Sequence, residues 1–202
     1  MKSIITIGDS IVTGRGETPN LGWAGRLKKD FESKETHHIL YNLGIPGDST
    51  TGLVKRIETE IKARAKYYWP GDKHITIIGI GINDTRAIDN PKNVQTKKSK
   101  FKSNIFKIIK FAKKLTDKVI ILGLTNVNES LTNPFDNTYF INSRIKEYNA
   151  IIKEQAKKQN VVFIDMFNLL NKKNLTDGLH PNTKGYDKMY KLIKKEIKKF
   201  KI

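Results

Sequence analysis

The sequence contains no cysteine and no apolar run long enough to cross a bilayer. The absence of cysteine excludes disulfides, cysteine-ligated zinc and thiol catalysis, and it fits a reducing compartment. Histidine is also rare: only four are present, so few residues could act as a base near neutral pH. Acidic residues number 20 against 38 basic ones, which gives a formal net charge of +18. We expect a soluble, globular protein without a membrane span.

Lysine supplies most of the positive charge, because only six of the 38 basic residues are arginine. Specific nucleic-acid sites favour arginine and interleave aromatic residues for stacking. Here the lysines fall on the polar faces of expected helices, which indicates a solvated surface that attracts polyanions only non-specifically. A basic nucleic-acid-binding protein on an α/β scaffold is the alternative from a different functional class.

Five short β-branched runs alternate with segments of helical periodicity along the 202 residues. This alternation predicts a five-stranded, parallel, doubly wound α/β sheet in a single domain, 1–202. The expected strands are 4–7, 38–43, 74–80, 119–124 and 161–165. The expected helices are 22–34, 49 to about 69, 101–115, 138 to about 159, a short one ending near 171, and 184–200. The apolar face of the last helix consists of Met189, Ile193, Ile197 and Phe200.

The first expected strand ends abruptly in Gly8-Asp9-Ser10. Glycine allows a sharp turn that would present the next two side chains at the end of the strand. A serine in that place can be a nucleophile or the N-cap of a following helix, and the stretch alone favours the cap. Signal-peptide cleavage would remove both the strand and Ser10, so we expect no such peptide and a cytoplasmic protein.

Ligands of such sheets bind at the carboxyl ends of the strands, where the unusual loops of this chain also lie. Three histidines lie at or before expected strand starts, on the opposite edge, which leaves His180 as the candidate base. Asp177 precedes it by three residues, so its carboxylate can bind one imidazole nitrogen while the other faces Ser10. The sequence therefore predicts a catalytic triad of Ser10, His180 and Asp177.

A serine that attacks an acyl carbon creates an oxyanion, which needs hydrogen-bond donors placed beforehand. Three donors are plausible: the backbone N–H groups of Ser10 and Gly44, and the side-chain amide of Asn83. Asn83 by itself is weak support, because asparagine in a glycine-flanked loop usually just makes a turn. Its occurrence together with the other residues favours the catalytic interpretation.

These residues resemble, in order, the four sequence blocks of the SGNH hydrolases, also called GDSL esterases/lipases. The blocks are Gly8-Asp9-Ser10, Asn42 with Gly44 and Gly47, Gly81-x-Asn83-Asp84, and Asp177-Gly-Leu-His180-Pro. The segments Gly22-Trp23-Ala24 and Asn160-Val-Val-Phe-Ile-Asp165 also look like connecting segments of that family. One departure is Ile11, where many members have leucine, a conservative difference.

The resemblance implies a flavodoxin-like, three-layer α/β/α fold and hydrolysis of esters or thioesters through an acyl-enzyme. It also implies the roles given above to Ser10, Gly44, Asn83, Asp177 and His180. We further expect Asp9 and Asp84 to contact the substrate, and the segment 125–137 to shape its pocket. No cofactor or metal is expected, because the chemistry requires none and the acidic and histidine residues show no ligand spacing.

Two other interpretations stay open. Within the same fold, the enzyme could be a carbohydrate O-deacetylase rather than an esterase for simple acyl chains. The last helix, with lysines beside its apolar stripe, could bind a membrane surface, although an ordinary helix covering the sheet explains it better. The acyl group, the leaving group, the oligomeric state and any partner of the positive surface do not follow from the sequence.

Overall fold

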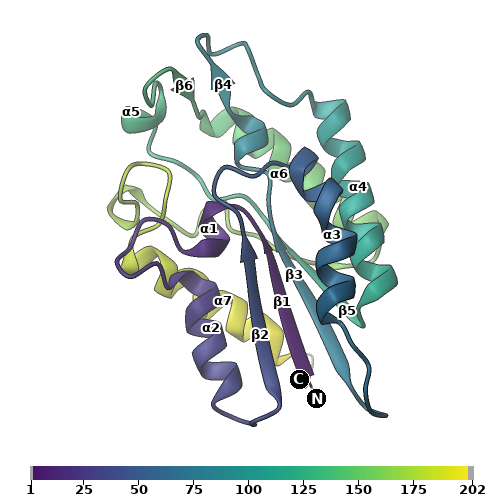
Figure 1. Ribbon diagram of the computed structural model, residues 1–202. Helices are drawn as coiled ribbons and strands as arrows, with labels where there is room; N and C mark the ends of the chain where they lie inside the picture. The colour runs from purple at the N-terminus through teal and green to yellow at the C-terminus, as the bar shows by residue number, and fades with distance from the viewer. Residues whose placement is uncertain (1, 200–202) are drawn as a thin grey trace.

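A computed structural model describes residues 2–199 and shows one parallel sheet between two layers of helices (Figure 1). The sheet strands are β1 (Lys2–Gly8), β2 (His38–Gly44), β3 (Lys73–Gly79), β5 (Lys118–Leu122) and β7 (Val162–Ile164). Their order is β2-β1-β3-β5-β7, with every pair parallel. Counted along the chain this is 2-1-3-4-5, the flavodoxin-like doubly wound order. The predicted fold class is confirmed.

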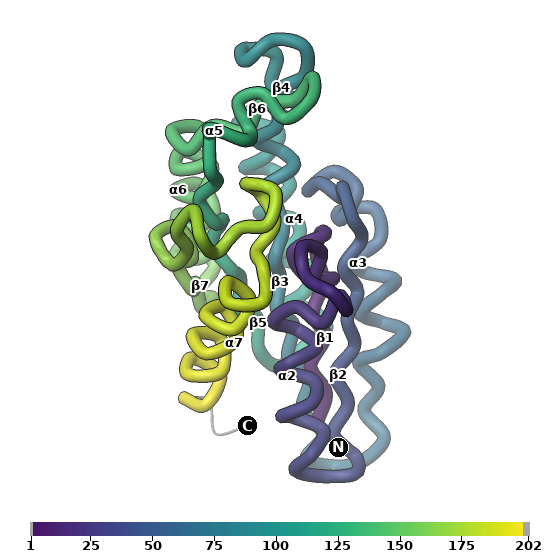
Figure 2. The backbone as a smooth tube through the Cα atoms, turned by 90° about the vertical axis from the view of Figure 1, so that its left-hand side faces the viewer, coloured from purple at the N-terminus to yellow at the C-terminus, as the bar shows by residue number. Residues whose placement is uncertain are grey.

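The helices divide between the two faces of the sheet. The long ones are α2 (Gly22–Glu32), α3 (Thr50–Arg64), α4 (Lys98–Leu115), α6 (Asn142–Lys158) and α7 (Thr183–Lys198). Helices α2 and α7 pack together on one face, while α3, α4 and α6 pack side by side on the other (Figures 1 and 2). A parallel sheet covered on both faces needs apolar strands throughout, which explains the nearly continuous isoleucine runs of β1 and β3.

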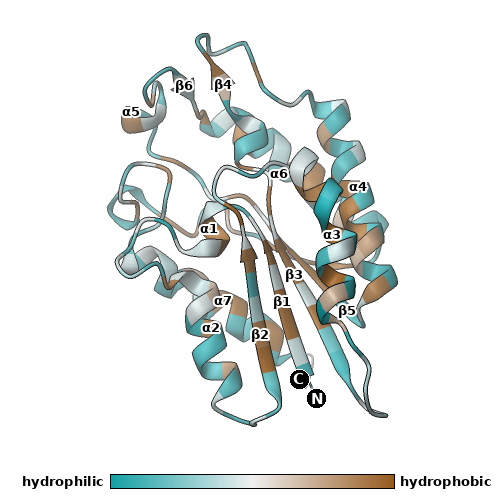
Figure 3. Cartoon of the chain, in the orientation of Figure 1, coloured by the Kyte–Doolittle hydropathy of each residue, from teal (hydrophilic) through white to brown (hydrophobic). Residues whose placement is uncertain are grey.

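The core lies on both sides of the sheet, and Figure 3 shows mainly apolar strands beside helices in which hydrophilic and hydrophobic residues alternate. The predicted apolar stripes of the helices are buried against it. They include Trp23, Leu27 and Phe31 of α2, Phe101, Ile105, Ile108 and Ala112 of α4, and Met189, Ile193 and Ile197 of α7. Phe200, the last predicted member of the α7 stripe, lies outside the described residues. Within those residues, no helix combines the length and the apolar composition that crossing a membrane requires.

Three predicted helices differ from the structure. Helix α3 ends at Arg64 rather than near residue 69, because the carboxylate of Asp72 accepts hydrogen bonds from the N–H groups of Tyr68 and Trp69, just before Pro70. Helix α6 starts at Asn142 rather than 138, since the preceding residues form a strand. The short helix predicted to end near 171 is absent, and a 3₁₀ turn, η2 (Lys172–Asn174), begins at that point.

Short elements surround the carboxyl ends of the sheet strands. They are α1 (Ser10–Thr13), η1 (Asn83–Thr85), β4 (Ala87–Ile88), α5 (Glu129–Thr132) and β6 (Thr138–Tyr139). Strands β4 and β6 pair antiparallel and project beyond the sheet, at the end opposite the N-terminus (Figure 2). The loop between β5 and α6 thus carries structure of its own and forms a wall above this edge of the sheet.

We expect Ile105→Ala to lower the free energy of unfolding by about 2–5 kcal/mol, because it leaves a cavity between α4 and the sheet. The Ile105 side chain is fully buried, whereas that of its neighbour Phe106 is 46% exposed. Phe106→Ala is therefore the matched control and should change stability by about 0.5 kcal/mol or less. Urea unfolding of both variants tests this, and equal losses would contradict the described packing of α4.

Candidate active site

Ser10 lies at the junction of β1 and α1, as the first residue of that short helix. The N-cap is Asp9, whose Oδ1 accepts a hydrogen bond from the N–H of Ile11 at 2.9 Å. The serine hydroxyl therefore has no capping function, which overturns the interpretation that its local sequence favours. It bonds instead with His180, at 2.9 Å between Oγ and Nε2. Both side chains are largely buried.

His180 is held in place by Asp177. Its Nδ1 lies 2.6 Å from Oδ2 of Asp177, while Oδ1 accepts from the backbone N–H groups of Leu179 and His180. Burial alone would raise the pKa of Asp177, but these hydrogen bonds outweigh it and hold the pKa well below its usual value. An ionised carboxylate can only accept, so Nδ1 carries a proton and Nε2 is free to accept from Ser10.

Asp9 and Asp84, expected on sequence grounds to contact the substrate, are buried away from solvent. Asp84 is fully buried, and its two oxygens accept from the N–H and the hydroxyl of Thr50 at 2.8 and 2.6 Å. Burial, with the nearby carboxylates of Asp48 and Asp84, raises the pKa of Asp9 from 3.8 to about 7. Both carboxyl groups are thus enclosed and hydrogen-bonded, and neither residue is among those that line the cavity in front of Ser10.

The backbone N–H groups of Gly44 and Gly47 differ in their hydrogen bonding. The N–H of Gly44 donates to Oδ1 of Asn42 at 3.1 Å, so this donor is already engaged. A side chain at Gly44 would lie 2.7 Å from the carbonyl oxygen of Asp9, which explains why the backbone here needs glycine. The N–H of Gly47, in contrast, has no partner among residues 2–199 and faces the same cavity as Ser10.

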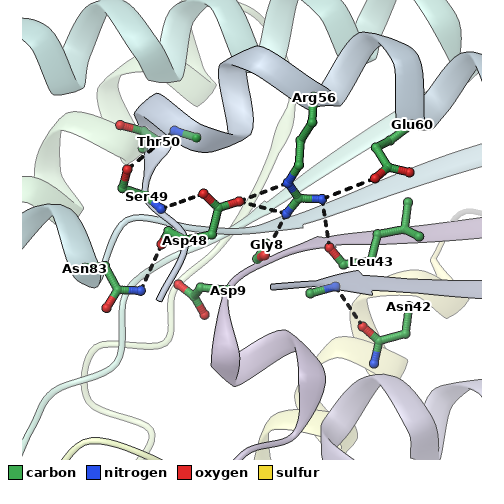
Figure 4. A network of polar contacts seen from close by, with 12 residues as sticks. Gly8, Asp9, Asn42, Leu43, Asp48, Ser49, Thr50, Arg56, Glu60 and Asn83 are labelled. Atoms are coloured by element: carbon green, nitrogen blue, oxygen red, sulfur yellow. Dashed lines mark hydrogen bonds and ion pairs between the residues drawn. The ribbon is translucent and has the colours of Figure 1, made fainter. Parts of the chain in front are cut away.

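The side chain of Asn83 reaches the same loop. Its Nδ2 donates one hydrogen to the carbonyl oxygen of Asp48 at 2.9 Å, and its second hydrogen stays available (Figure 4). This bond fixes the amide at the edge of the cavity that Ser10 and His180 also line. The structure thus brings Asn83 next to the predicted nucleophile, together with Gly47 rather than Gly44.

The side chain of Arg56 connects the loop that follows β2 to the ends of the sheet strands (Figure 4). Its guanidinium pairs with the carboxylate of Asp48 at 2.9 Å and donates to the carbonyl oxygens of Gly8 and Leu43. One side chain from α3 therefore joins the ends of β1 and β2 to the residue that holds Asn83. Sequence reasoning did not single out Arg56, since nothing in the pattern of a helix shows which arginine turns inward.

A cavity of about 230 Å³ opens in front of Ser10. Its lining combines the predicted catalytic residues with parts of three loops. The lining residues are Ser10, Arg15, Gly47, Asn83, Arg86, Phe135, Asp136, Asn137, Thr138, Phe140, Asp177, Leu179 and His180. The prediction that the segment 125–137 shapes the pocket is confirmed for its last three residues. Arg15 and Arg86 carry no motif and were missed.

Comparison with known proteins agrees with this geometry. A model of the GDSL-like lipase/acylhydrolase family matches residues 6–188, which is most of the chain. The chain belongs to this family. It is therefore an enzyme of the acylhydrolase and esterase class, as the four sequence blocks predicted.

Relatives of this acylhydrolase are distant in sequence. The chain is 24% identical to the uncharacterized protein YpmR of Bacillus subtilis over 217 residues, covering 97% of this chain and 81% of that protein. It is also 38% identical to a multidomain esterase of Ruminococcus flavefaciens over 60 residues, which cover 28% of this chain and 8% of that protein.

Solved structures resemble the whole fold of this acylhydrolase. A lipase/acylhydrolase from Enterococcus faecalis superimposes with a TM-score of 0.75 at 23% identity, covering 98% of this chain and 96% of that one. Axe2, an acetylxylan esterase from Geobacillus stearothermophilus, also gives 0.75 at 18% identity, with 96% and 93% covered. At these identities the likeness establishes the fold.

Because the carboxyl of Asp9 is buried, the stability of the protein should depend on pH. Because its folded-state pKa is raised to about 7, the folded chain holds a proton that the unfolded chain releases above about pH 4. Ionising it therefore costs stability as pH rises from about 4 through 7. Asp9→Asn keeps an acceptor for the Ile11 N–H, and we expect it to stabilise the protein at pH 8 by a few kcal/mol, with little gain at pH 4.5.

The measurement is the melting temperature of wild type and variant at both pH values. Asp136→Asn is the control, because it removes an exposed carboxylate that is solvated in folded and unfolded chains alike. Its effect should be the same at pH 4.5 and 8. A pH-independent difference for Asp9→Asn would contradict the burial of an uncharged Asp9.

Proposed function

We propose that the protein is a serine esterase that hydrolyses carboxylic ester or thioester bonds of small acyl substrates through an acyl-enzyme. The observation that carries the proposal is the unbroken chain of hydrogen bonds from Ser10 through His180 to Asp177, with contacts of 2.9 and 2.6 Å, at the floor of an open cavity. Nucleophile, base and orienting carboxylate stand in the order that serine hydrolysis requires. In the Geobacillus enzyme, catalytic mutants have been made at a serine and at a histidine.

In the first step, Ser10 Oγ attacks the acyl carbon while His180 Nε2 takes the hydroxyl proton. The imidazolium that forms is stabilised by the ionised Asp177, which keeps its own charge throughout. Collapse of the tetrahedral intermediate breaks the bond to the leaving oxygen or sulfur, and Nε2 returns the proton to that atom. A water then attacks the acyl-enzyme with His180 as base, which releases the acid and restores Ser10.

For the oxyanion we propose three donors: the N–H of Ser10, the N–H of Gly47 and the side-chain amide of Asn83. Neither backbone N–H donates to another residue within the described part of the chain, and all three residues line the cavity. Donors that are fixed before the reaction stabilise the developing charge without reorganising. We place Gly47 in this role instead of Gly44, because the N–H of Gly44 is already bonded to Asn42.

The size of the cavity favours short acyl groups. At about 230 Å³ it is smaller than the 300–1,000 Å³ usual for drug-sized ligands, which disfavours long acyl chains. Acetyl esters of carbohydrates fit this limit, so a carbohydrate O-deacetylase is the second candidate. The fold shared with an acetylxylan esterase supports it at the level of architecture. Release of acetate from acetylated sugars, compared with p-nitrophenyl acyl esters of increasing length, separates the two.

Ser10 should react with a fluorophosphonate. We expect intact-mass analysis to show one phosphonyl group on wild type and none on Ser10→Ala, because Ser10 bonds to His180 and lines the open cavity. Ser3 also bonds to a histidine, His74, but both side chains are buried in the core, where the reagent has no access. His180→Ala should slow labelling strongly, since it removes the base. Peptide mapping locates the modified residue, and labelling of any other serine would refute the assignment of the nucleophile.

Asn83→Ala should lower kcat by roughly 10²–10³, with little change in KM, because the amide acts on charge that develops in the transition state. Asn83→Asp should be at least as damaging, since it sets a negative charge beside the oxyanion. The matched control is Asn93→Ala, because Asn93 likewise donates to a backbone carbonyl, that of Ile88, but is exposed and distant from the cavity. A stable Asn83→Ala enzyme with wild-type kcat would remove Asn83 from the mechanism.

A further inference from the structure

The arginines of this lysine-rich chain fall into two groups. Four of the six have side-chain partners within the chain. Arg26 pairs with Glu17, Arg56 with Asp48 and Arg64 with Glu60, while Arg144 donates to the carbonyl oxygens of Thr85, Pro91 and Tyr139. The guanidinium groups of Arg15 and Arg86 have no hydrogen-bond or ion-pair partner among residues 2–199. Both of these arginines line the cavity in front of Ser10.

Arg86 is the more confined of the two. Its Nε is buried and has no hydrogen-bond partner among the described residues. Leaving a buried donor of a charged group unpaired is costly, so this Nε calls for an explanation, and an anion bound in the cavity would supply the missing acceptor. Its backbone is well anchored, because its N–H donates to the carbonyl oxygen of Asn83 and its own carbonyl accepts from Gln95. The side chain therefore projects from a fixed point three residues beyond the proposed oxyanion donor.

Arg15 follows the short helix α1 that begins with the nucleophile. Its N–H donates to the carbonyl oxygen of Ser10, and its carbonyl oxygen accepts from the hydroxyl of Tyr186 at 2.5 Å. The next residue, Gly16, packs so closely that a side chain there would lie 2.4 Å from the carbonyl oxygen of Pro181. Arg15 is thus fixed beside the His180 loop, with an exposed side chain.

The acidic residues that line the cavity do not form ion pairs with Arg15 or Arg86 in the described part of the chain. Asp177 is bonded to His180, and Asp136 is exposed and forms no ion pair with either arginine in the described structure. The cavity therefore presents two uncompensated guanidinium groups within reach of the reacting centre. A guanidinium binds carboxylate and phosphate oxygens through two parallel hydrogen bonds, which a lysine cannot do.

We propose that Arg86, assisted by Arg15, forms an anion-binding subsite, and that the substrate is an ester carrying a carboxylate or phosphate group near the scissile bond. This inference rests on the proposed esterase function and adds its substrate class. The two arginines determine specificity: they bind the anionic end, and Ser10 attacks the ester carbon beside it.

Two matched ester pairs test the proposal and separate the possible sources of charge. The first pair is monomethyl glutarate, which carries a carboxylate on its acyl group, and methyl butyrate, which is neutral. The second pair is acetylglycerol phosphate, which carries a phosphate on its leaving group, and neutral acetylglycerol. We expect wild type to favour the anionic member of at least one pair in kcat/KM. Arg86→Gln should lower kcat/KM for that ester about 10- to 100-fold, as expected for a lost charge-assisted hydrogen bond, and leave the neutral member within about twofold.

The variants have matched controls. Arg15→Gln should give a smaller loss in the same direction, because its side chain is exposed to solvent screening. Arg64→Gln removes the same charge at the far end of α3 and should leave the preference unchanged. Added salt should raise KM for the anionic ester in wild type and hardly affect the neutral one. Thermal melting verifies that Arg86→Gln is folded, and Arg86→Lys, which keeps the charge without the planar fork, should restore part of the preference.

The outcomes separate this proposal from the esterase assignment. The anion subsite is overturned if wild type turns over the anionic ester of each pair with a kcat/KM no higher than that of the neutral ester, and Arg86→Gln gives the same values. That result would leave the esterase assignment intact. Absence of any turnover and of Ser10 labelling would overturn the esterase assignment. In that case calorimetric binding of the anionic esters to Ser10→Ala decides the subsite: binding that Arg86→Gln abolishes supports it, and absence of binding refutes it.

Discussion

The close approach of β1 to β3 at the carboxyl edge of the sheet is the constraint on which the rest of the site depends. Gly8 stands opposite Gly44 on one side and Gly79 on the other, so three parallel strands end in register at glycine. A side chain at Gly8 would lie 1.8 Å from the carbonyl oxygen of Gly79, so no other residue fits there. The chain can therefore turn at once and present Ser10 at the carboxyl end of β1, between the ends of β2 and β3.

A layer of buried polar groups supports that turn from behind. Asp9 caps α1, Asp84 binds Thr50 at the start of α3, and Arg56 joins Asp48 to the strand ends. Buried carboxylates are tolerated because their oxygens are hydrogen-bonded, and for Asp9 because burial favours the neutral form. The result is a hydrogen-bonded support for Asn83 and Gly47, the proposed oxyanion donors, and such donors act best when they are in place before charge develops.

The opposite wall of the site has a different character. It comes from the loop between β5 and α6, whose strand β6 pairs with β4, and from the segment before α7, where the carbonyl oxygen of Gly178 accepts a hydrogen bond from the N–H of Asn128 in that loop. The segment before α7 also carries Asp177 and His180. The fold thus brings Ser10 and His180 within hydrogen-bond distance although they are 170 residues apart in the sequence. The proposed site therefore joins a serine held at the end of a sheet strand to a histidine and an aspartate held on a loop.

The sequence by itself determined the sheet, its helices and the order of the catalytic blocks. Parallel strands must be apolar and their ligands must bind at the carboxyl ends, so periodicity and position were enough to select Ser10, Asp177 and His180. Helix boundaries were predicted wrongly where groups outside the helix bond to its expected backbone. Asp72 accepts hydrogen bonds from residues where α3 was expected to continue. The residues expected to begin α6 form strand β6 and pair with β4.

Only the tertiary structure decided which donors and charges face the cavity. Gly44 and Gly47 look equivalent in a glycine-rich loop, and the bond from Gly44 to Asn42 is what separates them. Likewise, six arginines are alike in sequence, but within residues 2–199 the side chains of four have partners, whereas Arg15 and Arg86 line the cavity in front of Ser10 without one. A residue's type sets which bonds it can make, whereas the partners that the fold brings within 3 Å determine which of those bonds remain for a substrate.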